Sequence, residues 1–366
     1  MSAFNTILSR IPFVRRYQSR WVLFIAVSWT IADLIWIHYF HFSINLKGEA
    51  PFSYNSTRAI LLRGVIVSLM SSMMGFILIF KLRQVFRNVP LIINLLAKTS
   101  ILLLAAIIMN FLLYLTYSSL IQQLPINVGI ARFSKDAASI AWLLHHSLGW
   151  VVLFLITQLA IEFYEKYSPG VFWDIFIGRY IQPKVRKRII MFLDLTDSTP
   201  IAEKLDSTMY FSFIRDFIYY VSVAILEYHG RVYQYVGDEI VVYWKNSPEN
   251  KKNCINSLIL SSKLLERKSD YFRKRYGFIP QFKAGIHVGE VTVGEIGIIK
   301  KDILMGGDIM NTTSRICSIC GELHKKYIIS KEFLNGMEMN LPIEPLGTVD
   351  LKGKAQGVEL FALKIK

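Results

Sequence analysis

The sequence predicts a two-part chain, in which an all-α domain of four transmembrane helices precedes an α+β domain. The mean hydropathy of +0.37 and the 53% share of hydrophobic residues exclude a disordered chain and disfavour a wholly soluble one. Long apolar runs fill the first 163 of the 366 residues and then give way to mixed helix and strand patterns. The net charge of +15 suits the anionic surface of a membrane.

Two further features of the composition bound the function. The basic residues do not gather on one folded face, so no nucleic-acid partner is expected. Three cysteines do not make a disulfide framework, which places the soluble part in a reducing compartment.

Four apolar runs are long enough to cross a bilayer, which takes roughly 20 residues. They are Trp21–Phe42, Ile60–Phe80, Thr99–Leu120 and Ile140–Phe163. Together they define a transmembrane domain over residues 1–163. The alternative, four buried helices of a soluble protein, leaves the alternation of charge between the connecting loops without a cause.

Lysine and arginine near the ends of the spans predict the orientation. Basic residues gather before the first span, between the second and third, and after the fourth: Arg10, Arg15, Arg16, Arg20, Lys81, Arg83, Arg87, Arg179, Lys184, Arg186, Lys187 and Arg188. The other two loops hold only Lys47, Arg58, Arg132 and Lys135. Because basic loops stay in the cytoplasm, we expect both termini there, with the spans in the inner (plasma) membrane.

One acid and four histidines make a candidate sensor site in the membrane domain. Asp33 lies inside the first span, where an ionisable residue is a functional candidate. His38, His41, His145 and His146 fall near the outer ends of spans one and four. Neutral imidazoles bind Zn²⁺, Cu²⁺ or haem iron. The other interpretation is that the histidines are ordinary interfacial residues.

Residues 164–188 are expected to form a cytoplasmic connector helix. Tyr167–Gly170 interrupts the helix that leaves the membrane. Val171–Gly178 is amphipathic, so it can lie on the membrane surface or pair with a second copy. The sequence does not separate these two interpretations.

Residues 189–366 have the mixed pattern of one α+β domain, large enough for a core of its own. Strands are expected at Ile189–Asp194, Arg231–Val236, Ile240–Trp244, Phe282–Val288 and Val291–Glu295, and helices at Thr208–His229, Lys251–Tyr276 and Asn311–Cys320. Tight turns at Gly237-Asp238-Glu239 and at Gly289-Glu290 predict two hairpins.

Two acids carry the first candidate chemistry. Asp194 ends a predicted buried strand, where an unpaired carboxylate is costly. The polar loop after it offers backbone N–H groups to a phosphate, or else is an ordinary helix start capped by Asp197 or Ser198. Asp238 lies in a hairpin turn. If the two carboxylates meet, they need a cation between them, and Mg²⁺ takes carboxylate oxygen while keeping positions open for phosphate.

The second candidate chemistry lies near the C-terminus. Asn311 and Arg315 are four residues apart and so share one helix face. An amide can orient a sugar and a guanidinium can meet phosphate charge. Lys352 and Lys354 follow in a strand-to-turn segment. For each of these groups a solvated surface position is the plain alternative.

These residues give residues 189–366 a resemblance to the catalytic domain of class III nucleotidyl cyclases. The matching segments occur in the order of that family: Phe192–Thr199, Tyr235–Glu239, Gly285–Gly289, Gly307–Arg315 and Leu351–Gly353. The whole chain, with its four spans and short connector, resembles membrane-bound bacterial members of this family. The resemblance implies a ferredoxin-like βαββαβ core that works as a head-to-tail homodimer.

The resemblance also implies a role for each matching residue. Asp194 and Asp238 correspond to the family's metal aspartates, which hold two Mg²⁺ or Mn²⁺ per site, and the Leu195 backbone joins them. The loop that continues through Thr196, Asp197, Ser198 and Thr199 corresponds to the triphosphate loop. Asn311 corresponds to the ribose-orienting asparagine and Arg315 to the transition-state arginine, both from the partner. Lys352, or alternatively Lys354, corresponds to the triphosphate lysine.

Two positions depart from the family pattern. Its purine-selecting lysine and aspartate fall on Gln234 and Leu304, and Asp302 substitutes for the second only if the loop shifts. The Gln234 amide can read adenine or guanine. Since most bacterial members make cyclic AMP, ATP is the expected substrate, with GTP as the alternative.

Three other interpretations of the domain are open. The hairpin Val236–Ile240 also resembles that of diguanylate cyclases, which leaves Asn311 and Arg315 unexplained. A module that binds nucleotide without turnover is a second alternative. Cys317, Cys320 and His324 suggest zinc, but three ligands on one helix lack a fourth, so buried packing is favoured.

Overall fold

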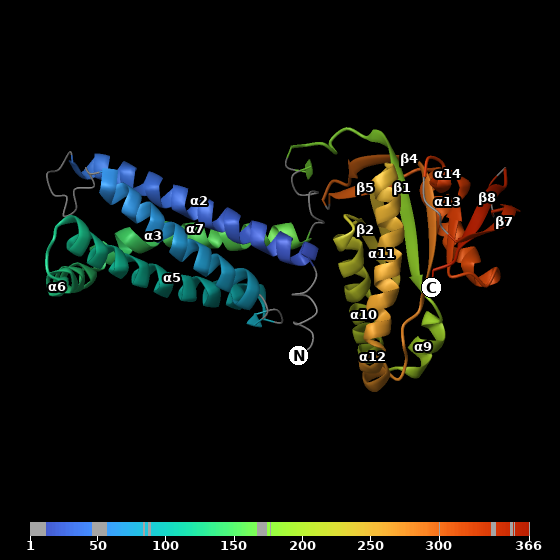
Figure 1. Ribbon diagram of the computed structural model, residues 1–366, viewed down its shortest axis with the longest axis horizontal. Coiled ribbons are helices and arrows are strands. Elements are labelled where there is room, and N and C mark those ends of the chain that lie inside the picture. Colours follow the sequence, from blue (N-terminus) through green and yellow to red (C-terminus); the bar gives the residue numbers. More distant parts are fainter. Residues whose placement is uncertain are drawn as a thin grey trace. The chain divides into compact units, whose positions relative to one another are not determined.

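The computed structural model describes residues 12–45, 57–82, 85–86, 89–166, 174–175, 177–299, 301–337, 342–351, 354 and 356–365. Within its helices, the side chains of residues 12–17, 37–45, 136, 140–146 and 164–166 lie outside the described set. The chain forms two compact units, Met1–Lys166 and Tyr167–Lys366 (Figure 1).

The described residues of the first unit form helices joined by short loops. Its elements are α2 (Pro12–Asn45), α3 (Thr57–Phe76) with the π-helix η1 (Ile77–Leu82), α5 (Leu91–Thr116) with the π-helix η2 (Tyr117–Ile121), α6 (Ile126–Ala137) and α7 (Ile140–Lys166). Four of them contain the four predicted spans, which confirms the all-α region of apolar helices. The short helix α6, in the loop between the third and fourth spans, was not anticipated.

The outward faces of these helices are apolar. Leu61, Leu69 and Leu96 are 65%, 67% and 63% exposed. A soluble bundle turns polar side chains outward, whereas lipid-facing helices carry aliphatic ones. The helix α10 (Ser207–Glu227) of the second unit has comparable length and hydropathy. Its Phe213 and Phe217 are fully buried among that unit's own elements, so we assign it to a globular core.

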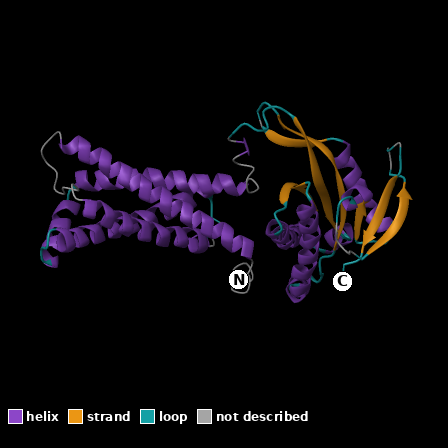
Figure 2. Ribbon diagram, turned by 45° about the horizontal axis from the view of Figure 1, so that its top comes forward, coloured by secondary structure: helices purple, strands orange, loops and turns teal. Residues whose placement is uncertain are grey.

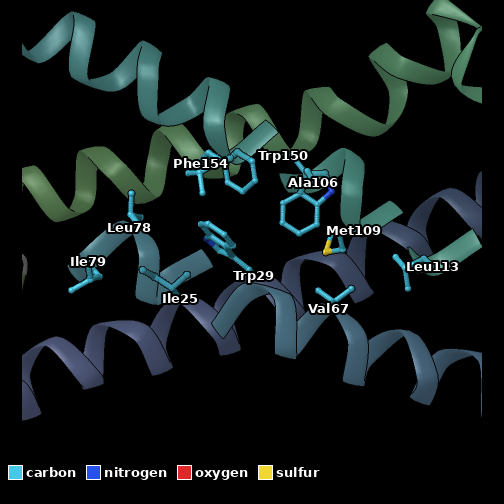
Figure 3. Packing of buried hydrophobic residues seen from close by; sticks show 11 residues of the cluster. Ile25, Trp29, Val67, Leu78, Ile79, Ala106, Met109, Leu113, Trp150 and Phe154 are labelled. Atoms are coloured by element: carbon cyan, nitrogen blue, oxygen red, sulfur yellow. The ribbon is translucent and has the colours of Figure 1, made fainter. Parts of the chain in front are cut away.

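Trp29 organises the interior of the helical unit (Figure 3). Its ring lies 6.2 Å from that of Trp150 and 4.8 Å from that of Phe154, centroid to centroid. The indole N–H donates a hydrogen bond of 3.0 Å to the Thr157 hydroxyl. A buried indole needs such a partner, and here the bond joins α2 to α7.

Asp33 and Arg63 form a buried ion pair between α2 and α3. The guanidinium donates through Nε and Nη2 to the two carboxylate oxygens, at 2.7 and 2.8 Å. The bidentate geometry satisfies both carboxylate oxygens inside an apolar bundle, which an isolated charge does not tolerate.

The second unit is built on one mixed sheet (Figure 2). Its strands are β1 (Lys184–Leu195), β2 (Arg231–Val236), β3 (Glu239–Lys245), β4 (Phe282–Ile296), β5 (Asp302–Gly306), β6 (Tyr327–Ser330), β7 (Ile343–Val349) and β8 (Val358–Leu363). The strand order is β2-β3-β1-β4-β6-β8-β7, and β5 pairs with β4. The helices are α9 (Ser198–Lys204), α10, α11 (Pro248–Arg267), α12 (Ser269–Tyr276), α13 (Asp308–Glu322) and α14 (Lys331–Leu334).

The first six core elements run β1-α10-β2-β3-α11-β4, and their strands lie side by side in the order β2-β3-β1-β4. This arrangement is the ferredoxin-like βαββαβ fold that the sequence predicted. The C-terminal strands β6, β8 and β7 extend the sheet beyond β4.

One predicted hairpin is wrong. Gly289 and Glu290 do not turn the chain but continue through β4, where they pair with Arg188 and Lys187 of β1. The reason is that β1 begins at Lys184, inside the range 164–188 expected to be a connector helix, and so offers partners along most of β4. The hairpin partner of β4 is instead β5.

Two smaller differences concern helices. The predicted helix Lys251–Tyr276 is divided at Lys268, which ends α11 before α12 begins. Within the expected connector, residues 167–173 and 176 lie outside the described residues, Asp174 and Ile175 are helical, and a turn follows at 177–180.

Gly285 sets the distance between α13 and the sheet. A Cβ at this position meets the backbone nitrogen of Cys317 at 2.4 Å. Only glycine lets the helix approach β4 so closely. This contact fixes where the exposed side of α13, which carries two of the predicted site residues, stands relative to the strands.

We therefore expect Gly285→Ala to lower the free energy of unfolding by about 1–3 kcal/mol, because α13 must move away from β4. Thermal unfolding of the purified protein in detergent, followed by circular dichroism, measures the change. Gly321→Ala is the matched control, since nothing lies within 4 Å of its Cβ position. Equal stability of the two variants would contradict this account of the packing.

Candidate active site

Asp194 lies near the C-terminal end of β1, between two neighbouring strands. On one side the pairing register sets it opposite Lys283 of β4. Its carboxylate accepts a 3.2 Å ion-pair contact from the Lys283 ammonium. On the other side the last pair with β3 is Leu193 with Ile240, so Asp194 comes next to Glu239 by continuation of the register.

Asp238 lies in the turn between β2 and β3. Gly237, with φ of 62°, supplies the left-handed conformation that the turn requires. One carboxylate oxygen of Asp238 is buried and makes no hydrogen bond among the described residues. A buried oxygen without a donor is costly, and a cation is one of the few groups that satisfies it.

Burial and the repulsion between neighbouring carboxylates raise the pKa values of two acids in this cluster, Asp194 and Glu239. Desolvation raises the pKa of Asp194, the Lys283 ammonium opposes that rise, and the charge of Asp238 adds to it. Burial and the charges of Asp194 and Asp238 raise the pKa of Glu239 to about 7. The sheet therefore gathers more negative charge than one lysine balances.

The cluster fits a divalent cation in the donor chemistry it offers. Mg²⁺ and Mn²⁺ prefer oxygen ligands, and Asp194 and Asp238 supply them. No group of three His, Cys, Asp or Glu side chains stands at ligating distance in the described part of the chain. An ion held here would complete its shell with oxygens from the backbone, of which Leu195 at the end of β1 is a candidate, from water and from a phosphate-bearing ligand.

The loop after β1 starts α9 without a side-chain cap. Asp197 stands at the N-cap with φ of 56°, and its side chain accepts no capping hydrogen bond. The capping alternative that the sequence offered for Asp197 is thus not realised. The Thr196 backbone N–H donates to the Gln281 carbonyl at 2.8 Å, Ser198 hydrogen-bonds Tyr210, and Thr199 is exposed.

Asn311 and Arg315 lie on α13, away from its packed face. Thr312 and Thr313 of the same helix are completely buried, whereas Asn311 is exposed and Arg315 is half-buried. No hydrogen bond or ion pair between described residues joins Asn311 or Arg315 to Asp194 or Asp238. The described contacts of the single chain thus do not link the two halves of the predicted site.

Gln234 and Leu304 come from strands that are linked to each other. Both side chains are exposed, on β2 and β5 respectively. The Met305 backbone N–H donates a 3.0 Å hydrogen bond to the hydroxyl of Tyr233, the residue before Gln234. Asp302 lies at the opposite end of β5, where it pairs with Ile296 and accepts a hydrogen bond from the Ile303 N–H.

Lys354 makes an ion pair of 2.6 Å with Asp308, at the start of α13. The Lys354 ammonium holds the pKa of Asp308 below its usual value. The pair lies on the wall of a polar cleft of about 610 Å³, which Lys331, Glu332 and Glu359 also line. Lys352 lies outside the described residues.

Lys283 and Glu239 are the site residues that the sequence reasoning missed. Glu239 stood in a quoted motif without a role, and Lys283 stood inside a predicted strand. The signal that finds them is strand register, since Asp194 lies between β3 and β4. Registers across three strands are not readable from one sequence.

The cysteines of α13 behave as packing residues. The thiols of Cys317 and Cys320 are buried and hydrogen-bond backbone carbonyls. Burial raises the pKa of both thiols, which disfavours the thiolate that zinc requires. The packing interpretation of this Cys-x-x-Cys segment is the one that fits.

Of the predicted membrane sensor residues, Asp33 is described and is paired with Arg63. The side chains of His38, His41, His145 and His146 lie outside the described set. Asp33 also borders a cavity of about 220 Å³ with Trp36 and Trp150.

Comparison with known proteins places the second unit. Residues 182–364 match the family model of the adenylate and guanylate cyclase catalytic domain. Over 242 residues, 64% of the chain, it is 28% identical to adenylate cyclase 2 of Rhizobium meliloti (strain 1021), and over 218 residues, 56%, it is 22% identical to an adenylate cyclase of Anabaena cylindrica. These alignments span only 65% and 43% of the relatives' own lengths.

The fold has a counterpart among solved structures. A bacterial light-regulated adenylyl cyclase matches with a TM-score of 0.53 at 17% identity, over 62% of this chain and 66% of that one. At this identity the likeness concerns the fold.

The raised pKa of Glu239 gives a prediction for stability. The folded state holds the Glu239 proton more tightly than the unfolded state does. The contribution of this proton to the free energy of unfolding is therefore complete below pH 4.5 and is lost as the pH rises through about 7. We expect Glu239→Gln to flatten that pH dependence, measured by thermal unfolding of the purified protein without added divalent ions.

The exposed Glu266 of α11 provides the control. Glu266→Gln is expected to keep the pH dependence of the unchanged protein. An unaltered slope in Glu239→Gln would show that this carboxyl does not feel the two aspartates.

Proposed function

Because the chain belongs to the family of adenylate and guanylate cyclase catalytic domains, we propose that it is a membrane-bound adenylate cyclase. It converts ATP to 3′,5′-cyclic AMP and pyrophosphate at sites shared by a homodimer. The observation that carries the proposal is the crowding of Asp194, Asp238 and Glu239 at the end of β1, with an Asp238 oxygen left without a donor.

Asp194 and Asp238 hold the two divalent ions in this proposal, together with the Leu195 carbonyl. When bound, Mg²⁺ or Mn²⁺ lowers the pKa of the ribose 3′-hydroxyl and neutralises phosphate charge. The 3′-hydroxyl gives up its proton to water, and its oxygen forms a bond to the α-phosphorus. The bond between the α-phosphorus and the oxygen that bridges to the β-phosphorus breaks, and pyrophosphate leaves.

The residues of this chain position the nucleotide. The loop Leu195–Thr199 and the Lys283 ammonium, 3.2 Å from Asp194, lie where the triphosphate meets the ions. Lys283 balances one aspartate in the single chain and is placed to meet phosphate charge when ions occupy that role. Lys352 or Lys354 serves the triphosphate from the partner, and Lys354 must then exchange Asp308 for phosphate.

Asn311 and Arg315 act from the partner subunit. Neither contacts the aspartates of its own chain through a described bond, and both are accessible on α13. The Asn311 amide orients the ribose, and the Arg315 guanidinium stabilises the charge that grows on the α-phosphate. Comparable arginines contribute roughly 10³–10⁵ in rate.

ATP is the proposed substrate and GTP the second candidate. The Tyr233–Met305 hydrogen bond links β2 to β5, which supports the proposal that Gln234 and Leu304 contact the same base. Gln234 both donates and accepts, whereas Leu304 offers no polar group to the guanine edge. Both relatives described above are named adenylate cyclases, which supports ATP.

The helical unit anchors the enzyme in the inner (plasma) membrane, with both termini in the cytoplasm. Its apolar outer faces and the basic residues near the predicted cytoplasmic loops support this orientation. The ion pair Asp33–Arg63 joins α2 to α3, and small shifts of these two helices are a means by which the membrane unit can pass on a signal.

The shared site predicts complementation between two inactive variants. Asp194→Ala and Arg315→Ala are each expected to lose roughly 10³-fold or more in turnover. Mixed dimers regain one intact site, so equal coexpression restores about a quarter of the activity, by random pairing in a two-fold dimer. Cyclic-nucleotide production in membranes measures it.

Coexpression of Asp194→Ala with Asp238→Ala is the control. Both substitutions remove an aspartate that each site takes from a single subunit, so no site of a mixed dimer is intact. If the first mixture stays as inactive as this control while the unchanged protein turns over, the site is not shared between subunits.

Product analysis with ATP and GTP in parallel tests the substrate. We expect cyclic AMP to dominate, and Gln234→Glu to shift the ratio toward cyclic GMP, because a carboxylate accepts from the guanine N1–H and amino group. Predominant cyclic GMP from the unchanged protein would favour the guanylate cyclase, and the absence of either product from a demonstrated dimer would favour a nucleotide-binding module.

A further inference from the structure

The loop between β4 and β5 carries aliphatic side chains in water. Ile298 and Ile299 are 95% and 102% exposed, and Ile296, which ends β4, is 49% exposed. Single exposed aliphatic residues are common on soluble domains, but two consecutive, completely exposed isoleucines at a hairpin tip mark a contact surface. We call residues 296–301, of which Lys300 lies outside the described residues, the hairpin tip.

The hairpin tip is tied to the segment that enters the catalytic unit. The Glu295 backbone N–H donates a 2.8 Å hydrogen bond to the Tyr180 carbonyl. The Pro183 ring packs on Gly294, 3.1 Å from its Cβ position. Ile177, Ile181 and Val185 of this entering segment are also exposed, by 65%, 72% and 59%. One end of the sheet thus combines aliphatic residues from two segments.

Most of the charged residues beside these aliphatic residues are basic, although Arg179 pairs with Asp174 at 2.7 Å and the exposed Asp302 follows Lys301 at the tip. Residues 177–188 hold five basic side chains, Arg179, Lys184, Arg186, Lys187 and Arg188, and no acidic one. At the tip, the Lys301 ammonium pairs with Glu295 at 2.7 Å, and its side chain is 68% exposed. Aliphatic side chains with a basic surround are the composition of surfaces that bind anionic lipid.

The covalent chain limits how far this end can lie from a bilayer. Helix α7 ends at Lys166, and Tyr180 follows 14 residues later. Even a fully extended segment of that length spans at most roughly 3.3–3.6 Å per residue, or about 50 Å. The entering segment, on which the hairpin tip packs, therefore stays within about this distance of the membrane leaflet at which α7 ends.

We propose that the hairpin tip inserts Ile298 and Ile299 into the anionic lipid surface of that leaflet, while the basic residues of 177–188 meet its headgroups. The occupant is lipid rather than a second copy of the chain, because a copy brings the same positive surface and two such surfaces repel. The contact gives the catalytic unit a second attachment to the membrane besides the chain itself.

A fluorescent label on the tip of the full-length protein tests the proposal. The introduced cysteine of Ile299→Cys is labelled with the environment-sensitive dye NBD. The native Cys254, Cys317 and Cys320 are buried, so background labelling is expected to be low. The protein is reconstituted in vesicles of phosphatidylcholine and phosphatidylglycerol, with or without nitroxide-labelled lipid. Phe211→Cys, at a 67% exposed position on α10, carries the same dye as control.

We expect blue-shifted emission at position 299 and quenching by the nitroxide lipid at least about two-fold stronger than at position 211. Ile298→Cys is expected to give the same result, which guards against a local effect of one label. Water-like emission without quenching at 299 would overturn the proposal. Blue-shifted emission that the nitroxide lipid does not quench would also overturn it, in favour of contact with a second copy.

Discussion

Electrostatic crowding at one end of β1 is the constraint on which the catalytic unit depends. The sheet sets Asp194 beside Lys283 on one strand and next to Glu239 on the other, and the β2–β3 turn adds Asp238. One ammonium does not neutralise three half-buried carboxyls, and the pKa values of Asp194 and Glu239 are raised by burial and by the neighbouring negative charge. This repulsion favours a bound cation, which is the basis of the divalent-ion site proposed above.

A second set of candidate site residues, Asn311 and Arg315, lies on α13, and the packing of this helix on the sheet fixes their position. Gly285 allows α13 to pack on β4 backbone to backbone, while the buried threonines of α13 fix its rotation. Asn311 and Arg315 thereby come to lie on the side of α13 away from its buried threonines. The dimer proposed above is the assembly in which these residues of one chain would serve the aspartates of another.

The helical unit has its own constraint, because its apolar surfaces make polar partners scarce and favour pairing within the bundle. Trp29 bonds Thr157 and Asp33 bonds Arg63, so α2 is joined to α7 and to α3 by directed contacts. Directed polar contacts have few alternative geometries, unlike aliphatic packing. These two contacts therefore fix the position of α2 against both of its neighbours.

The sequence by itself determined the four apolar helices and the order of most strands and helices from β1 to α13, because hydrophobic period and turn chemistry are local. It also predicted Asp194 and Asp238 as candidate metal ligands. It failed at Gly289-Glu290, where the length of β1 decided that the chain continues straight, and it missed Lys283 and Glu239. Those outcomes needed the tertiary structure, since strand register and helix docking are set by contacts between residues far apart in the chain. The same holds for the hairpin tip, because a pair of isoleucines reads as core until the fold leaves them exposed.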